Sequence, residues 1–123
     1  MAKKIQTSGV EALVAVIVHG LQEKKGINIV SLDLRKTSSA FADFFVICNG
    51  GSARQVDALA DSVEAEVRKA LAEKPTHREG NDESEWVLLD YINVVVHIFS
   101  EEKRNFYQLE ALWGDGTIAK HDS

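Results

Sequence analysis

Two groups of residues have the types and spacing that catalysis needs, and the first is a glycine-serine turn. Gly50, Gly51 and Ser52 lie between an apolar run and a helical pattern. Backbone amides at a helix start point outward from its positive end, which is how many proteins hold phosphate groups. A nucleotidyltransferase uses a Gly-Ser pair in this way, but it also needs two carboxylates on a following strand for magnesium. No such pair follows here, and Asp57 and Asp61 have the pattern of a solvated helix face. The simpler interpretation is a tight turn.

The second group is Asp90 and His97, within the apolar stretch from Trp86 to Phe99. If this stretch forms two strands joined by a turn at Ile92 and Asn93, Trp86 lies opposite Phe99, Leu88 opposite His97 and Asp90 opposite Val95. The aspartate and the histidine are then diagonal neighbours on one face. Such a pair could act as a general acid and base. The alternative is a core histidine whose ring proton is bonded by the carboxylate. No serine, threonine or cysteine nucleophile can be assigned beside them, so no catalytic residue is predicted.

Metal and cofactor sites find no support in the sequence. The histidines at 19, 77 and 121 fall on a helix flank, in a loop and in the tail, without the spacing of metal ligands. Cys48 is the only cysteine, and its place in the middle of a strand predicts a buried, unreactive thiol. A single cysteine also excludes an internal disulfide, which favours a reducing compartment.

Composition limits the remaining function classes. A chain of 123 residues that is 45% apolar and 27% charged is typical of one globular domain. Its net charge of -5 argues against direct nucleic-acid contact and suits a basic partner, a class in which ribosomal proteins are numerous. The apolar run Ala12–Val18 is shorter than a membrane span, and no signal-peptide cleavage pattern follows it. We therefore expect a cytoplasmic protein without membrane contact.

Periodicity in the first half of the chain predicts helix, strand, strand and helix. A capping box that begins at Ser8 starts a helix over about 9–25, and Gly26 is expected to take the left-handed closing position. Strands follow over 27–34 and 43–49. Ser52 and Gln55 form a second capping box, and its helix extends to about Glu73, before Pro75.

The second half is predicted as a loop, a hairpin, a short helix and a tail. Residues 74–84 have almost no apolar side chain and should form an exposed loop. In the hairpin, the face of Val87, Leu89 and their alternating partners is apolar and should be covered by the helices. A short amphipathic helix follows Glu101 and is closed by Gly114, with an apolar stripe that includes Leu109. We expect a single domain over residues 1–114 and a polar tail over 115–123.

The expected fold is a mixed sheet with helices packed on it. The strand over 43–49, the helix after it and the strand that begins at Trp86 should form a right-handed parallel crossover. With the hairpin this gives a sheet of about four to five strands, of the α/β class, with α+β as the alternative.

Two aromatic residues point to an interface with another protein. Trp86 begins a strand at the end of the exposed loop, and Tyr107 lies beside the apolar stripe of the last helix. Aromatic residues that are not fully buried often anchor protein interfaces. The alternative is packing at the periphery of the core.

A series of sequence segments stands in unbroken order between about Ile29 and Trp113. They are Ala42-Asp43-Phe44-Phe45-Val46-Ile47, Gly51-Ser52-Ala53-Arg54-Gln55-Val56, Ala60-Asp61, Trp86-Val87-Leu88-Leu89-Asp90-Tyr91, Val94-Val95-Val96-His97-Ile98-Phe99 and Arg104-Asn105-Phe106-Tyr107-Gln108-Leu109-Glu110-Ala111-Leu112-Trp113. On these segments the chain resembles the ribosomal silencing factors, also called Iojap-like proteins. One departure is Ile92-Asn93, where the family usually has Gly-Asp. It matters because isoleucine resists the positive φ that a two-residue turn tends to need.

This resemblance implies a translational repressor that is not an enzyme and needs no cofactor. Family members bind ribosomal protein fourteen of the large subunit and sterically block its joining to the small subunit. They are often homodimers, and their fold is similar to that of nucleotidyltransferases. A residual nucleotide-binding or nucleotidyltransferase activity is the alternative. The partner-binding surface that the resemblance implies consists of Trp86, Asp90, Glu102, Tyr107, Leu109 and Glu110.

Overall fold

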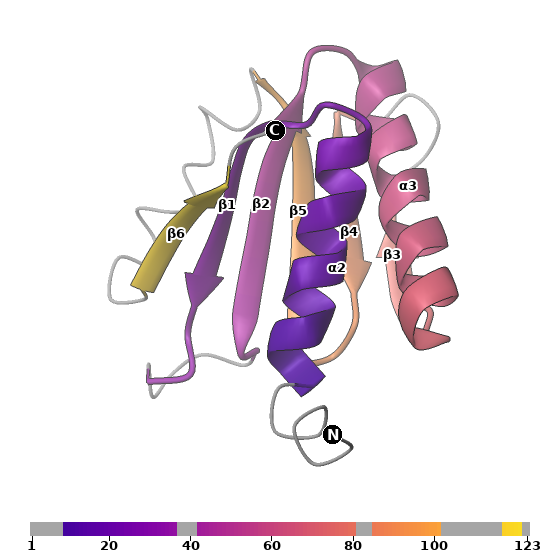
Figure 1. The fold of residues 1–123 in the computed structure, drawn as a ribbon. Coiled ribbons are helices and arrows are strands. Elements are labelled where there is room, and N and C mark those ends of the chain that lie inside the picture. The colour runs from indigo at the N-terminus through magenta and orange to yellow at the C-terminus, as the bar shows by residue number, and fades with distance from the viewer. Residues whose placement is uncertain (1–8, 37–41, 81–84, 102–116, 122–123) are drawn as a thin grey trace.

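The computed structural model of the protein describes residues 9–36, 42–80, 85–101 and 117–121. Two helices pack on one face of a mixed sheet, whose described strands have the order β3-β4-β5-β2-β1-β6 (Figure 1). The fold class is therefore the predicted one, with six strands in place of four to five. The elements are α2 (Gly9–Glu23), β1 (Ile27–Asp33), β2 (Phe44–Gly50), α3 (Ala53–Leu71), β3 (His77–Glu79), β4 (Trp86–Asp90), β5 (Val94–Ser100) and β6 (Thr117–His121).

The main hydrophobic core lies between the helices and the sheet. Helix α2 lies over β2 and β5, and α3 lies over β4 and β5 (Figure 1). The hairpin contributes the face that the sequence assigned to this role, which confirms the predicted alternation. Its core residues are Val87, Leu89, Tyr91, Val94, Val96 and Ile98, packed with Leu13, Val14, Ile17, Val18 and Leu21 of α2 and Val56, Leu59, Ala60, Val63 and Val67 of α3.

The two helices approach each other closely at Gly20. The Ser62 hydroxyl donates a hydrogen bond of 2.8 Å to the Gly20 carbonyl oxygen. A Cβ atom at position 20 would lie 3.1 Å from the Cα of Val63, which is tighter than ordinary van der Waals contact. A glycine therefore sets the distance between α2 and α3.

The end of α2 differs from the prediction. Lys25, with φ of 60°, takes the left-handed conformation that the sequence assigned to Gly26. Gly26 is needed for space instead, since a Cβ there would lie 2.5 Å from the Cys48 sulfur and 3.1 Å from the Leu21 carbonyl oxygen. The predicted burial of Cys48 is confirmed, and its side chain is fully enclosed. Ser8, the expected cap of this helix, lies outside the described residues.

Helix α3 begins at its predicted cap and ends two residues before the predicted end. The Ser52 hydroxyl accepts the Gln55 amide at 3.1 Å. Ala72 closes the helix in the left-handed conformation, with φ of 57°, and its amide donates to the Arg68 carbonyl. The helix therefore ends before Pro75 can act on it.

The parallel pair in the sheet is not the predicted one. Strand β2 runs parallel to β5, the second strand of the hairpin, whereas β4 pairs with β5 in the antiparallel direction. The hairpin register is as predicted, with Trp86 opposite Phe99 and Leu88 opposite His97. The crossover after α3 therefore reaches its parallel position only at the second strand of the hairpin, because the first strand, β4, lies on the far side of β5 from β2.

Two segments that were expected to be irregular form edge strands. Residues His77–Glu79, inside the predicted loop, form β3 and pair with β4. Residues Thr117–His121, inside the predicted polar tail, form β6 and pair with β1. Both predictions were wrong at these positions, since short polar strands lack the apolar alternation that identifies a strand in a sequence. The predicted helix after Glu101 lies outside the described residues, apart from Glu101, which is helical.

A second apolar cluster lies on the sheet face opposite the helices. Partly buried Leu88 of β4 packs against this cluster. The buried members of the cluster are Val30, Leu32, Leu34, Ala42, Phe45, Ile47, Val95 and Phe99.

Within the described part of the chain, no helix has the length and apolar character that crossing a membrane requires.

Candidate functional site

Trp86 is a large apolar side chain at the surface of the second sheet face. Its side chain is 37% exposed, and it begins β4 directly opposite Phe99 of β5. The indole stacks on the Phe99 ring, with centroids 5.7 Å apart and 13° between the planes. The tryptophan predicted as an interface anchor is therefore neither sealed in the core nor loosely attached to the surface.

His97 lies behind the indole and is only 7% exposed. Its ring stacks on Trp86 at 6.1 Å, and Phe45 meets it edge-on at 5.1 Å. The indole Nε1–H donates to Nδ1 of His97 at 3.4 Å. Because indole nitrogen only donates, Nδ1 must accept and Nε2 must carry the hydrogen of the neutral ring. Burial lowers the pKa of His97 to about 4, so the ring is neutral at physiological pH.

Asp90 and His97 do not form an acid–base pair. Asp90 is the last residue of β4, and its carboxylate Oδ1 accepts the Ile92 amide at 2.7 Å. The carboxylate therefore stabilises the turn. On this face of β4, Leu88 lies between Asp90 and Trp86. The alternative prediction, a histidine proton bonded by a carboxylate, is also wrong. Among the described residues, Nε2 of His97 has no hydrogen-bond partner.

The turn after Asp90 presents an exposed isoleucine in an unusual conformation. Ile92 has φ of 77° and its side chain is 63% exposed. The Asn93 amide donates to the Tyr91 carbonyl at 2.9 Å, which closes a three-residue turn around Ile92. The Asn93 carbonyl then accepts the amides of Asp43 and Phe44, at 2.8 and 3.1 Å. The structure thus accepts the positive φ that isoleucine disfavours, and it fixes the turn to the start of β2.

Of the six residues of the predicted partner surface, the structure describes two. Trp86 and Asp90 share one face of β4 and lie four positions apart, or about 13 Å along a strand. They therefore belong to one surface but do not touch. The other four, Glu102, Tyr107, Leu109 and Glu110, lie outside the described residues.

The glycine-serine turn uses its polar groups within the chain. The Gly51 amide donates to Oε1 of Gln55 at 2.7 Å, and the Gln55 side-chain nitrogen donates to the carbonyls of Lys24 and Lys25, each at 3.2 Å. The turn therefore ties the start of α3 to the end of α2, which is the structural interpretation of the two glycines. Across the described ranges, no cluster of three histidine, cysteine or carboxylate side chains could hold a metal ion.

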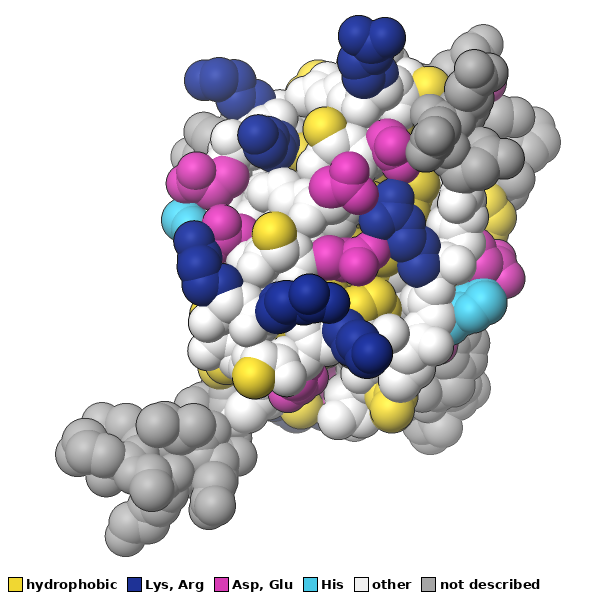
Figure 2. All heavy atoms as spheres, turned by 90° about the vertical axis from the view of Figure 1, so that its right-hand side faces the viewer, with side chains coloured by type: hydrophobic (Ala, Val, Ile, Leu, Met, Phe, Trp, Pro, Cys, Tyr) yellow, Lys and Arg dark blue, Asp and Glu magenta, His cyan; other side chains and the backbone are white. Residues whose placement is uncertain are grey.

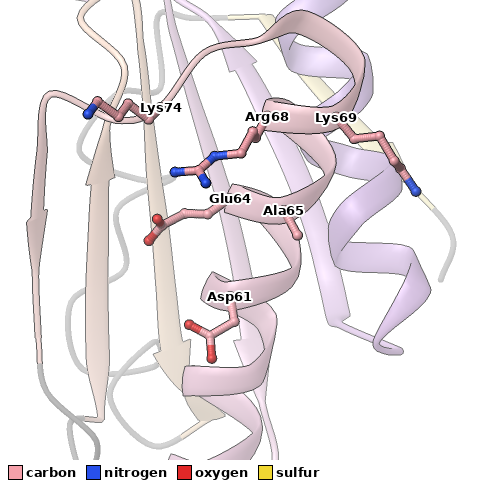
Figure 3. Close-up of a pocket in the computed structure, with 6 residues that line it drawn as sticks. All are labelled: Asp61, Glu64, Ala65, Arg68, Lys69 and Lys74. Atoms are coloured by element: carbon pink, nitrogen blue, oxygen red, sulfur yellow. The ribbon is translucent and has the colours of Figure 1, made fainter.

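Charged side chains of both signs cover the outer surface of α3 (Figure 2). An open groove of about 410 Å³ runs there, and its residues come from α3 and from Lys74. Asp61, Glu64 and Arg68 point to the side of α3 that faces β3 and β4, whereas Lys69 points away from them (Figure 3). Both carboxylates already pair with Arg78 of β3. The acidic helix face predicted as solvated is therefore an anchor for the edge strand.

The role of His97 as a partner of Trp86 was not predicted from the sequence. The predicted register already contained it, because Trp86 opposite Phe99 makes it diagonal to His97, just as Asp90 is. Aspartate was considered as the partner because it lies on a diagonal to His97 and its carboxylate can accept the ring proton. In the structure His97 contacts Trp86 instead, because the imidazole ring can both pack against the indole and accept its hydrogen bond.

A family model and several related proteins assign the sequence to the same family. Residues 7–123 match the family described as "Ribosomal silencing factor during starvation". The chain is 39% identical over 108 residues to Ribosomal silencing factor RsfS of Halalkalibacterium halodurans, covering 85% of this chain and 88% of that protein. It is 40% identical over 102 residues to the Haemophilus influenzae protein of the same name, covering 83% and 98%.

The fold agrees with a solved relative. A crystal structure of a Chromobacterium violaceum protein superposes with a TM-score of 0.78 at 36% identity, covering 85% of each chain. A family match over nearly the whole sequence, together with this shared fold, leaves one conclusion. The chain belongs to the family of ribosomal silencing factors.

Proposed function

We propose that this protein represses translation by occupying the large ribosomal subunit. Its partner there is ribosomal protein fourteen, and its bound position sterically prevents the small subunit from joining. It performs this role in the cytoplasm, as an obstruction rather than as a catalyst. The observation that carries the proposal is the exposed, stacked indole of Trp86, on a chain that belongs to the ribosomal silencing factors.

The physical basis is an aromatic anchor next to acidic groups. A tryptophan that is already held against the sheet brings a large apolar area to an interface and loses little side-chain entropy on binding. Asp90, on the same face, adds negative charge, and the chain as a whole carries a net charge of -5. Burial of the indole would supply affinity, while carboxylates meeting arginine or lysine would set orientation and the rate of encounter.

The remaining predicted residues extend this surface in the proposal. Tyr107 and Leu109 act as further apolar anchors, and Glu102 and Glu110 as further acids. A homodimer is also proposed, with an interface that adjoins or overlaps the partner surface. Sedimentation of the free protein and of its complex with large subunits tests whether the two assemblies exclude each other.

Binding to purified large subunits tests the interface directly. The double variant Trp86→Ala, Tyr107→Ala should lose co-sedimentation that the unaltered protein shows. Ile118→Ala is a matched control, because Ile118 is also an exposed apolar residue, 45% exposed, but lies on β6 at the opposite edge of the sheet. Normal binding by the double variant would refute the interface assignment.

A subunit-joining assay tests the proposed mechanism. Added protein should reduce the fraction of joined ribosomes in proportion to its occupancy of large subunits, and the double variant should not. Binding without any effect on joining would rule out occlusion. Calorimetry with ATP and magnesium addresses catalysis separately. Heat of specific binding that Gly51→Val abolishes would contradict the proposed non-enzymatic role.

A further inference from the structure

We propose that His97 is the positioning residue of Trp86, which it holds in a fixed orientation for its partner. The inference rests on the proposed function, because it takes Trp86 to be the interface anchor. It adds a buried residue that never touches the partner and acts through the indole. Three features of the geometry support it.

The first feature is a layer of nearly parallel rings. Trp86 stacks on Phe99 with 13° between the planes, and on His97 with 12°. His97 and Phe99 are themselves parallel within 5°, with centroids 6.0 Å apart. The planes of all three rings are therefore nearly parallel. Contacts of this kind fix the tilt of a ring but leave it able to slide within its own plane or to turn over.

The second feature is the hydrogen bond that limits such movement. The indole Nε1–H points at Nδ1 of His97, 3.4 Å away. This bond distinguishes the two edges of the indole, so it selects one of the two flipped orientations that stacking alone would accept. Burial keeps the His97 ring neutral at physiological pH, and so Nδ1 remains an acceptor.

The third feature is the cost of having a histidine at this position. With Nδ1 accepting, the hydrogen is on Nε2, which is buried and has no partner among the described residues. A buried donor without an acceptor destabilises a fold, and an apolar side chain would avoid that penalty. The second sheet face is lined mostly by apolar residues such as Phe45 and Val95, although Asn49 is also buried there. The hydrogen bond that Nδ1 of His97 accepts from the indole explains why a polar ring occupies this position.

Prior immobilisation of the anchor should appear as affinity. A side chain that is ordered only on binding reduces affinity by the entropy it loses, whereas one held beforehand does not. Loss of the hydrogen bond should therefore weaken binding to the large subunit by about two- to tenfold. The effect should pass through Trp86 alone, which makes the inference separable from a general loss of stability.

Nuclear magnetic resonance on the unaltered protein tests the geometry. At pH 7 the imidazole nitrogen shifts of His97 should report the Nε2–H tautomer. The indole N–H of Trp86, assigned through Trp86→Phe, should exchange slowly with water and shift when His97→Phe removes the acceptor. An Nδ1–H tautomer, or an indole proton that exchanges as in a free tryptophan, would overturn the inference, and both are measured on the unaltered protein.

A double-mutant cycle tests the consequence for binding. His97→Phe keeps a ring but removes the acceptor, whereas His97→Asn places an oxygen close to the position of Nδ1 and should restore affinity. In a Trp86→Phe background, which lacks the indole donor, His97→Phe should cause no further loss. Unfolding by urea measures the stability of every variant, so affinities are compared only among folded proteins.

The cycle also separates this inference from the proposed function. If Trp86→Ala binds large subunits normally, the interface assignment fails, whatever the hydrogen bond does. If Trp86→Ala loses binding but His97→Phe binds as tightly as the unaltered protein, or loses equal affinity in both backgrounds, the interface stands and the positioning role is wrong.

Discussion

The guanidinium nitrogen Nη1 of Arg78 lies 2.6 Å from Oε2 of Glu64, and this contact ties the edge strand β3 to helix α3. The same arginine reaches Asp61 and Asp57, each at 3.0 Å. One guanidinium group thus forms ion pairs with three carboxylates that are spaced along one side of a helix. The carboxylates would repel one another without it, so the arginine serves both the helix and the strand.

Arg78→Ala should lower the free energy of unfolding by about 1–2 kcal/mol, because it breaks a network rather than a single surface pair. Urea denaturation measures this, and the loss should shrink in high salt, which screens the remaining carboxylates. Arg68→Ala is the control, since Arg68 is an exposed arginine of α3 with no ion pair among the described residues. Equal losses in both variants would contradict the role of the network.

Ile92→Gly should stabilise the protein by about 1 kcal/mol. A β-branched residue at positive φ carries about 1–3 kcal/mol of strain, which glycine relieves, and the greater freedom of glycine in the unfolded chain offsets part of this. Little burial is lost, because the side chain is 63% exposed. Ile92→Ala separates the two effects, since it removes the side chain but keeps an L-residue at φ of 77°. Thermal and urea unfolding should rank glycine above alanine.

Gly26→Ala should destabilise the fold by about 1–3 kcal/mol through overpacking. The added methyl group would lie 2.5 Å from the Cys48 sulfur, so α2 or β2 must move. Cys48→Ala in the same chain should recover part of the loss, because it removes the sulfur that the methyl group meets. Gly9→Ala is the matched control, since nothing lies within 4 Å of a Cβ at that position. Additive losses at positions 26 and 48 would show that the two do not meet.

Stability should fall as the pH drops from about 6.5 to 4, through His97. Burial lowers the pKa of this ring to about 4, whereas a histidine in an unfolded chain has a pKa near its usual value of 6.5. Between these values the unfolded chain binds a proton that the folded chain does not, so acid favours unfolding. The loss amounts to about 3 kcal/mol at the lower end.

Urea denaturation at several pH values measures this dependence. His97→Phe should show a flatter profile over the same range, because its ring does not titrate. Carboxylates add their own acid sensitivity below about pH 5, and they do so equally in both proteins. Identical profiles would mean that His97 has the same pKa in the folded and the unfolded chain.

Part of the candidate site could be predicted from the sequence because it depends on local pattern. Alternation along the hairpin placed Trp86 and Asp90 on one face and fixed the register with β5, since a slip of one residue would turn every side chain to the wrong side. The partner of His97 was not predictable in this way. His97 is diagonal to both Trp86 and Asp90 in this register. Only the directions of the side chains in the folded protein decide which of the two it contacts.

By itself, the sequence determined both helices, the apolar faces and the hairpin, because these follow from the spacing of residues that are neighbours along the chain. Only the tertiary structure decided the edges of the sheet. Strand β6 has almost no apolar alternation and exists because it pairs with β1, where Ser31 and His121 share a hydrogen bond across 90 residues. Strand β3 is likewise held by Arg78 against α3. Polar edge strands are specified by the partners that receive them, and those partners are far away in the sequence.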